Sequence, residues 1–164
     1  MDARVQVAAP GLAPAAAMEN CLFCKIARGE VEASVVYKSP ACLAFMDVYP
    51  ISRGHALVIP LEHQAHLDDL DEAARQELLA TASRVLAAQR RSGLAAGGAN
   101  LMLNDGSAAN QHVAHVHIHV VPREHGDTLR TALRYLGRMV NVFGSKAGRA
   151  ELEQIAARIR ASLS

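Results

Sequence analysis

Residues 115–121 of this 164-residue chain alternate histidine with valine or isoleucine, in the order His-Val-His-Ile-His-Val-Val. Successive side chains of a β-strand point to opposite faces of the sheet. As a strand, this run places three imidazoles on one face and Val116, Ile118 and Val120 on the other. We therefore expect one strand to contribute both to an apolar core and to a cluster of titratable side chains.

The histidine face has three interpretations. The structural one is a row of solvated histidines, since polar side chains are rarely buried without hydrogen-bond partners. The first functional interpretation is a three-histidine metal centre of the hydrolytic zinc type. The second is an imidazole nucleophile flanked by imidazoles that tune it. The pattern favours a functional site and leaves the choice between the last two open.

Composition limits the classes of partner. Lysine and arginine number 17 against 16 aspartates and glutamates, and no basic run occurs, so a nucleic acid polymer is not expected as a ligand. No apolar stretch reaches the length of a membrane span, so no membrane association is expected. Three cysteines, at positions 21, 24 and 42, are too few for a disulfide framework, which favours a reducing, cytoplasmic setting. We expect a site for a small molecule.

The chain is long enough for one domain with its own core. Residues 1–18 are rich in alanine and interrupted by Pro10 and Pro14. We expect them to form a flexible N-terminal extension, followed by one domain over residues 19–164. Residues 125–149 give mixed signals and no assignment, and the C-terminal region 125–164 is included in that domain.

The spacing of apolar residues predicts the order of the elements. A short helix over residues 21–28, capped by Asn20 and ended by Gly29, comes first. A long helix begins near Asp71 and ends near Gly93, and a C-terminal helix carries the apolar positions 152, 155, 156 and 159. The expected strands span 35–37, 42–46, 55–60, 100–104 and 115–121. Because the connections are short, we expect an α+β domain: an antiparallel five-stranded sheet with the long helix and the C-terminal helix on one face.

The histidine run resembles the signature of the histidine triad (HIT) superfamily, in which three histidines alternate with apolar residues. Residues 43–47 (LAFMD) and 54–60 (GHALVIP) look like two strands of that superfamily. Residues 21–26 (CLFCKI) look like the opening of its bacterial members. The resemblance covers about residues 20–123 and implies the HIT-like fold.

The resemblance implies a nucleotide hydrolase or nucleotidyl transferase. His117 stands at the position that attacks an α-phosphorus to form a covalent nucleotidyl-histidine, and a neutral imidazole is a competent nucleophile near pH 7. His119 stands where it can bind a phosphate oxygen or protonate the leaving group. His55 corresponds to an upstream active-site histidine. This scheme needs no catalytic cofactor.

The same resemblance implies a nucleotide-binding pocket. Asp47 stands at the position of a ribose-binding carboxylate, and Phe45 and Val48 would flank the base, although turn capping and core packing are alternative roles. The expected phosphate contacts are uncharged groups: Asn104, Gln111 and His112. The chain departs from the family pattern at His112, where many members carry a small hydroxyl residue, and at Asn110, where they carry glycine.

Cys21 and Cys24 lie one turn apart on the expected short helix. Such a pair can be half of a zinc site, a redox pair or two small core residues. In the bacterial members with a similar opening, zinc is bound by both cysteines, by a histidine after the third strand and by the first triad histidine. Those positions here are Cys21, Cys24, His63 and His115, with His66 as a second histidine nearby. A closed Cys₂His₂ set is structural rather than catalytic.

The expected substrate is a purine nucleotide with a substituent on its α-phosphate, such as a nucleoside phosphoramidate or a dinucleoside polyphosphate. A homodimer is expected, because family members commonly form one that extends the sheet across the two-fold axis, and the long helix could supply part of the interface. Two other functions remain open: a nucleotide-binding regulatory module with little turnover, and a three-histidine metallohydrolase. Turnover unchanged by His117→Ala would favour the first, and loss of activity on chelation would favour the second.

Overall fold

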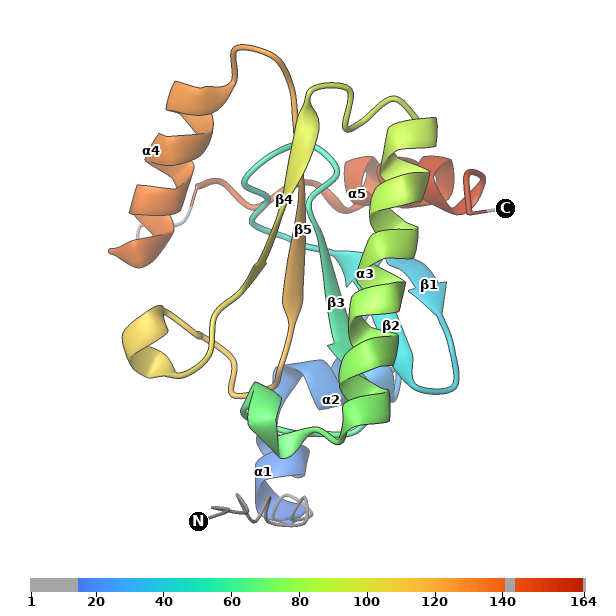
Figure 1. Cartoon of the computed structure of the whole chain (residues 1–164), viewed down its shortest axis with the longest axis vertical. Coiled ribbons are helices and arrows are strands. Elements are labelled where there is room, and N and C mark those ends of the chain that lie inside the picture. The colour runs from blue at the N-terminus through green and yellow to red at the C-terminus, as the bar shows by residue number, and fades with distance from the viewer. Residues whose placement is uncertain (1–14, 141–143, 164) are drawn as a thin grey trace, which may run out of the picture.

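All neighbouring strands of the sheet are antiparallel. The computed structural model describes residues 15–140 and 144–163. The spatial order is β1-β2-β3-β5-β4 (Figure 1). The strands are β1 (Val35–Lys38), β2 (Cys42–Met46), β3 (Ala56–Pro60), β4 (Gly98–Leu103) and β5 (Ile118–Arg123). The expected α+β class and antiparallel five-stranded sheet are confirmed.

The helices of the described residues differ widely in length. They are α1 (Ala15–Asn20), α2 (Leu22–Ala27), α3 (Glu72–Arg91), α4 (Thr128–Met139) and α5 (Arg149–Arg160), with 3₁₀ turns η1 (Leu67–Asp69) and η2 (Ser107–Ala109). The expected start of the long helix is confirmed, because the Asp71 carboxylate caps α3 by accepting the N–H of Ala74 at 2.7 Å. Over the described ranges, no helix is long and apolar enough to cross a membrane.

The two faces of the sheet pack against different helices, because side chains in β2 and β3 alternate. Ala44 and Val58 belong to the large core cluster formed with α3 and α5. Phe45 and Leu57 point to the other face and join a second cluster with Phe23 of α2. The long and C-terminal helices therefore share one face, as expected, and the short α2 packs on the opposite face.

The histidine run enters the sheet later than expected. β5 begins at Ile118, so His115 and His117 precede the strand. The reason is that the N–H of Val116 donates to the carbonyl oxygen of Gln64 at 2.8 Å, rather than to a neighbouring strand. The alternation itself is confirmed: the three apolar side chains of the run lie in the core cluster on the α3 side, and all three histidines are buried.

Two expectations at the N-terminal end need correction. Asn20 ends α1, and Cys21 occupies the N-cap of α2 without a side-chain capping bond. The expected end of the flexible extension, residue 18, falls inside α1, where the alanine-rich sequence favours a helix. Residues 1–14 of that extension lie outside the described residues. The stop at Gly29 is confirmed, because its φ of 77° favours glycine.

Helix α4 lies in the region that received no assignment from the sequence. In Figure 1 it stands apart from the sheet, in orange. Its exposed side carries large apolar residues at helical spacing, Leu129, Leu133 and Leu136, and the exposed Val140 follows its last residue. Its other side reaches the loop after β2, where the Arg134 guanidinium donates to the carbonyl oxygens of Pro50 and Ile51 at 3.2 and 3.0 Å.

Candidate active site and metal centre

A cavity of about 680 Å³ lies on the α2 side of the sheet. Its walls come from α2, the end of β2 and the following loop, β4 and its following loop, the histidine run and α4. Among its lining residues are seven of the expected site residues: Phe45, Asp47, Val48, Asn104, His112, His117 and His119. The structure thus brings most of the expected nucleotide-binding residues together with two of the triad histidines.

His117 contributes a neutral imidazole to this cavity. Its Nδ1–H donates to the carbonyl oxygen of His115 at 2.7 Å, which leaves the lone pair on Nε2. Burial lowers the pKa of His117, and the hydrogen bond to His115 opposes part of that change. The ring of Phe23 packs edge-on against it, with ring centroids 5.2 Å apart. A neutral imidazole held in one tautomer can act as a nucleophile through Nε2.

A chain of hydrogen bonds through His55 fixes the orientation of the His119 ring. The N–H of Ile51 donates to Nδ1 of His55 at 3.2 Å, so His55 carries its hydrogen on Nε2 and donates to Nδ1 of His119 at 3.0 Å. The Asp47 carboxylate lies 3.5 Å from the same Nδ1 of His55, but an amide N–H can only donate, so this nitrogen is an acceptor. Burial holds the pKa of His55 well below its ordinary value and lowers the pKa of His119 to about 2. His119 is therefore neutral with its hydrogen on Nε2, and His55 supports it without lining the cavity.

Asp47 is buried at the end of β2 and has two hydrogen-bond donors. Oδ1 accepts from the N–H of Tyr49 at 2.8 Å, and Oδ2 accepts from Nη2 of Arg138 at 2.8 Å. The arginine comes from α4, in the region without a predicted element. A carboxylate can accept about four hydrogen bonds. Asp47 therefore keeps acceptor capacity for a ligand in the cavity.

The loop after β4 uses its expected phosphate-binding residues in different ways. Asn104 and His112 line the cavity, whereas Gln111 does not. The Gln111 amide nitrogen donates to the carbonyl oxygen of Ala65, and its oxygen accepts from the N–H of Gly106, both at 2.8 Å. The Gln111 side chain therefore closes the loop, because both ends of its amide bond to the backbone.

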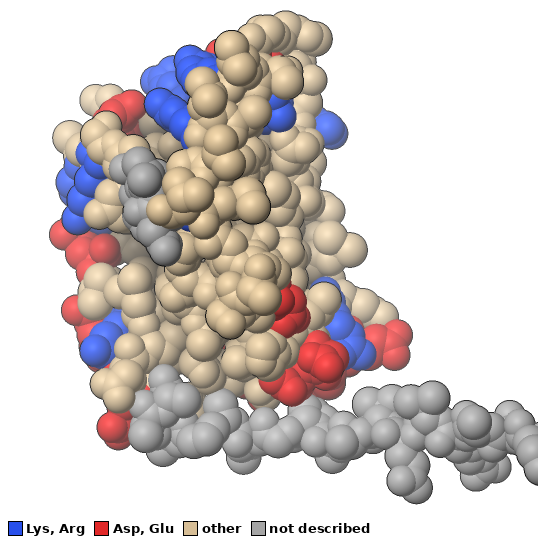
Figure 2. Space-filling view, turned by 90° about the vertical axis from the view of Figure 1, so that its left-hand side faces the viewer, with Lys and Arg blue, Asp and Glu red and all other residues tan. Residues whose placement is uncertain are grey.

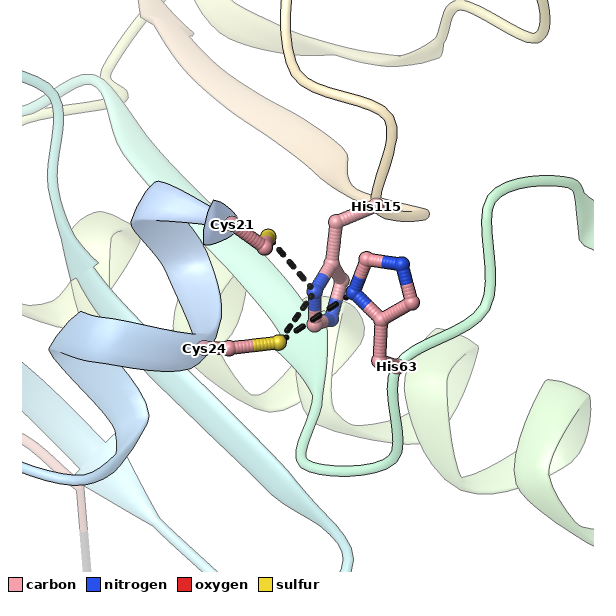
Figure 3. A group of neighbouring side chains, drawn as sticks. All are labelled: Cys21, Cys24, His63 and His115. Atoms are coloured by element: carbon pink, nitrogen blue, oxygen red, sulfur yellow. Dashed lines mark hydrogen bonds between the residues drawn. The ribbon is translucent and has the colours of Figure 1, made fainter. Parts of the chain in front are cut away.

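Four buried side chains form a group that could hold a metal ion, and they are the four expected from the sequence (Figure 3). Sγ of Cys24 lies 3.2 Å from Nδ1 of His63 and 3.6 Å from Nδ1 of His115. Sγ of Cys21 lies 3.5 Å from Nδ1 of His115. Zinc bonds of about 2.3 Å to sulfur and 2.1 Å to nitrogen give ligand separations of about 3.6 Å in a tetrahedron. The spacing and the donor atoms therefore fit zinc.

His115 is oriented toward the cysteines by a hydrogen bond on its other nitrogen. Its Nε2–H donates to the carbonyl oxygen of Pro60 at 2.9 Å, which leaves the Nδ1 lone pair directed at the sulfur atoms. Burial lowers the pKa of His115 to about 4 and raises the pKa of the Cys24 thiol to about 11. The imidazole is therefore a ready ligand, whereas the thiol must give up a proton to a metal.

His66 takes no part in the metal-ligand group. It pairs instead with Asp105, with 2.6 Å between Nδ1 and Oδ1, and this bond raises the pKa of His66. Within the described part of the chain, the other possible ligand group is Asp47, His55 and His119. The hydrogen bond between the two imidazoles already uses two of its nitrogen atoms. Neither group contains all three histidines of the run.

Part of the cavity wall comes from residues that the sequence did not single out. Three belong to α4: Tyr135, Arg138 and Met139. The spacing of the leucines in residues 129–136 is a helix signal, but it marks the exposed side of α4. No pattern in the sequence indicates that the opposite side of the helix returns to the cavity.

The sequence matches the HIT domain family over residues 28–126. An adenosine 5′-monophosphoramidase of Schizosaccharomyces pombe is 36% identical over 104 residues, which are 63% of this chain and 74% of that protein. An adenylylsulfatase of Arabidopsis thaliana is 38% identical over 112 residues, which are 67% of this chain and 55% of that protein. The crystal structure of a zinc-bound histidine triad family protein from Mycobacterium smegmatis has a TM-score of 0.73 at 34% identity, and the match covers 89% of this chain and 94% of that one. The chain therefore belongs to the HIT domain family.

Proposed function

We propose that this HIT protein is a nucleotide hydrolase or nucleotidyl transferase that acts on a purine nucleotide with a substituted α-phosphate. The observation that carries the proposal is the neutral His117 ring, whose free Nε2 lone pair lies in a cavity of about 680 Å³. That volume is within the range of small-molecule sites, roughly 300–1,000 Å³. The apolar wall of the cavity suits a base, and its uncharged hydrogen-bond donors suit a phosphate. The one buried carboxylate suits the hydroxyls of a ribose.

In the proposed first step, Nε2 of His117 attacks the α-phosphorus, a P–N bond forms and the bond to the leaving group breaks. The imidazole becomes positively charged, and its Nδ1–H bond to the His115 carbonyl oxygen stabilises that charge. Nε2–H of His119 donates a hydrogen bond to a phosphate oxygen, and the leaving group takes its proton from solvent. In the second step, water attacks phosphorus and gives a proton to solvent, and the P–N bond breaks to release the mononucleotide and neutral His117.

The proposed nucleotide contacts follow the lining of the cavity. Asp47 would accept the ribose hydroxyls, with Phe45 and Val48 against the base. Asn104 and His112 would contact the phosphate, because both line the cavity together with the triad. Gln111 is proposed to act through the loop that its side chain closes.

The leading substrates are a nucleoside phosphoramidate and a dinucleoside polyphosphate. The names of two relatives, an adenosine 5′-monophosphoramidase and an adenylylsulfatase, support an adenylyl group that carries a substituent on its phosphate. The mostly apolar lining around Phe45 supports a planar base at one end of the cavity.

Single-turnover mass spectrometry tests the mechanism. Excess protein is mixed with adenosine 5′-phosphoramidate and quenched so that acid-labile P–N bonds survive. We expect an adenylyl group on His117 of the wild type and none in His117→Ala. Release of AMP without an adduct would overturn the covalent step. A regulatory module would instead bind AMP with slow turnover that His117→Ala leaves unchanged, and a three-histidine metallohydrolase would lose activity on chelation without forming an adduct.

We propose that Cys21, Cys24, His63 and His115 bind a structural zinc ion. Their burial, their tetrahedral spacing and the zinc-bound relative from M. smegmatis support this assignment. Four protein ligands leave no open position, so the ion would hold α2 against the histidine run and take no part in catalysis. Reduced thiols are needed for such a site, which supports the cytoplasmic setting expected from the sequence.

We also propose that the chain forms a homodimer through the side that carries α4. β4 is an edge strand with Leu101 exposed, and the apolar row of α4 is exposed as well. Figure 2 views this side and shows a central area largely without charged side chains. Such areas mark interfaces between proteins.

Light scattering tests the dimer, for which we expect twice the chain mass of 17.5 kDa. Leu133→Glu on α4 should give a monomer. Leu79→Glu is the comparison, because Leu79 is similarly exposed, at 57% against 60%, but lies on the long helix α3. It should stay dimeric, and a monomer in this variant alone would place the interface on α3 instead. A wild-type monomer would contradict the proposal.

A further inference from the structure

Helix α4 follows the segment that matches the HIT domain family, residues 28–126, yet it forms part of the cavity wall. Three leucines are exposed along the helix, at positions 129, 133 and 136, whereas Tyr135 and Arg138 line the cavity. The residues expected to bind nucleotide all lie before residue 127. The polar side of α4 therefore adds side chains to the cavity wall beyond those expected to bind nucleotide.

Two arginines one turn apart hold α4 against the loop at the Asp47 end of the cavity. Arg134 donates to the carbonyl oxygens of Pro50 and Ile51 at 3.2 and 3.0 Å. Arg138 donates to Asp47 at 2.8 Å, and the arginine side chain is only 16% exposed. A charge-assisted bond of this kind, partly shielded from water, fixes both partners. The inner side of α4 is thus placed at the carboxylate proposed to receive the ribose.

Tyr135 brings an unsatisfied hydroxyl group to the same wall. Its oxygen is buried and has no hydrogen-bond partner among residues 15–140 and 144–163. A buried hydroxyl without a partner is unfavourable, so such groups are rare in folded proteins. Because Tyr135 lines the cavity one turn before Arg138, an acceptor on a bound ligand can satisfy it.

The Asp47 carboxylate has acceptor capacity left for two hydroxyl groups. It offers about four acceptor sites, and the N–H of Tyr49 and the Arg138 guanidinium each take one. Nδ1 of His55 takes none, because it is itself an acceptor for Ile51. About two sites remain, which equals the number of free hydroxyls, 2′ and 3′, on the ribose of a nucleoside 5′-phosphate. The bond to Arg138 sets the direction in which these sites point.

We propose that Tyr135 and Arg138 form a nucleoside-recognition edge that selects a ribonucleoside 5′-phosphate. Tyr135 is a binding residue that donates its hydroxyl hydrogen to an acceptor on the ribose or the base. Arg138 is a positioning residue that holds Asp47 so that it accepts both ribose hydroxyls. The inference rests on the proposed function in one respect, that the ligand is a nucleotide. It concerns binding and adds nothing to the transfer onto His117.

Calorimetric titration with AMP and with 2′,3′-dideoxy-AMP tests the two roles separately. Tyr135→Phe is expected to weaken AMP binding roughly three- to tenfold, the range for one neutral hydrogen bond. Arg138→Met is expected to weaken AMP binding by about tenfold or more, with little change for the dideoxy nucleotide, and Arg138→Lys should restore most of the loss. In turnover assays, the same variants should raise KM and change kcat by less than about twofold.

Arg130→Met is the matched control, because Arg130 lies on the same helix with its side chain 63% exposed and outside the cavity. Unchanged AMP affinity in Tyr135→Phe and Arg138→Met would overturn the inference even where the wild type hydrolyses its substrate. Equal losses for both nucleotides in Arg138→Met would overturn the positioning role. If Arg138→Met does not fold, Tyr135→Phe and Arg138→Lys decide. Wild-type AMP affinity in Tyr135→Phe overturns the edge, and so does an Arg138→Lys variant that loses as much affinity for dideoxy-AMP as for AMP, each relative to wild type.

The proposed hydrolase activity and the recognition edge can each be overturned without the other. A wild type without hydrolytic activity, whose variants show the expected losses of AMP affinity, would remove the hydrolase and leave the recognition edge. A wild type that binds neither nucleotide would overturn the edge.

Discussion

Nδ1–H of His117 donates to the carbonyl oxygen of His115 at 2.7 Å, so a residue of the metal-ligand group also fixes the tautomer of the proposed nucleophile. The imidazole of His115 faces Cys21 and Cys24, while its backbone carbonyl holds the ring two residues later. One residue therefore connects the metal group to the cavity. Any change that displaces His115 is expected to alter the position of the His117 ring, although His117 lies outside the ligand group.

Cys24→Ser is expected to lose bound zinc, to unfold at a lower temperature and to turn over more slowly. Loss of the ligand frees His115, and misplacement of His117 should lower kcat by roughly ten- to hundredfold, as for loss of supporting bonds at other metal sites. Elemental analysis measures the zinc content, thermal unfolding measures the unfolding temperature, and steady-state kinetics measure kcat. Cys42→Ala is the control, because Cys42 is buried but outside the group. Equal zinc in Cys24→Ser and wild type would contradict the assignment.

His117→Ala is expected to lower kcat by roughly a thousandfold or more, because it removes the proposed nucleophile. AMP should still bind, since the Asp47 end of the cavity is unchanged. His125→Ala is the control, because His125 is exposed and does not line the cavity. Rapid-quench kinetics with adenosine 5′-phosphoramidate measure kcat, and calorimetry measures binding. A variant with wild-type turnover would show that another group attacks the phosphorus.

The free energy of unfolding is expected to fall as pH drops from 7 to 5. His55 and His119 are buried and neutral, with pKa values far below the ordinary 6.5, so the unfolded chain binds protons that the folded chain does not. Their stabilising contribution is complete above about pH 6.5 and is lost as pH falls below it, by up to about 1.4 kcal/mol per pH unit for each histidine. Urea titrations across this range measure the slope.

His55→Gln isolates one of these two groups. Glutamine can accept the N–H of Ile51 and donate to His119, but it does not titrate. The slope of stability against pH should therefore decrease by about 1.4 kcal/mol per pH unit below pH 6. Comparison with the wild type under the same conditions cancels metal loss common to both proteins. Parallel curves would mean that His55 takes up protons in the folded state.

Local spacing predicts elements whose buried positions repeat, and it fails where backbone pairing departs from side-chain alternation. β2, β3, α3 and α5 follow from periods of two or about 3.6 residues. The start of β5 does not, because Val116 keeps its place in the core while its N–H bonds to Gln64. Alternation of side chains therefore does not define where a strand begins.

The residues of the candidate site also fall into those that the sequence predicted and those that it did not. The resemblance led to cavity and metal-group residues because they lie in the segment shared with the family, residues 28–126, or just before it. Tyr135 and Arg138 lie beyond that segment, and their role depends on how α4 returns to the cavity. Gln111 is the opposite case: the residue type suits phosphate binding, but both ends of its amide are used within the loop. Long-range placement and competing hydrogen bonds are not visible in a sequence pattern.

Asn110 has a left-handed backbone, with φ 67° and ψ 33°, at the position where the chain departs from the glycine of the family pattern. Asparagine tolerates this conformation, whereas a residue such as alanine pays roughly 1–2 kcal/mol for it. We expect Asn110→Ala to lower the free energy of unfolding by about 1 kcal/mol and Asn110→Gly to change it little. Because the Asn110 carbonyl oxygen accepts from the Asn104 amide at 3.4 Å, the alanine variant should also raise KM. Urea unfolding and steady-state kinetics measure both effects, and equal stability of the two variants would contradict a left-handed residue in the loop proposed to contact the phosphate.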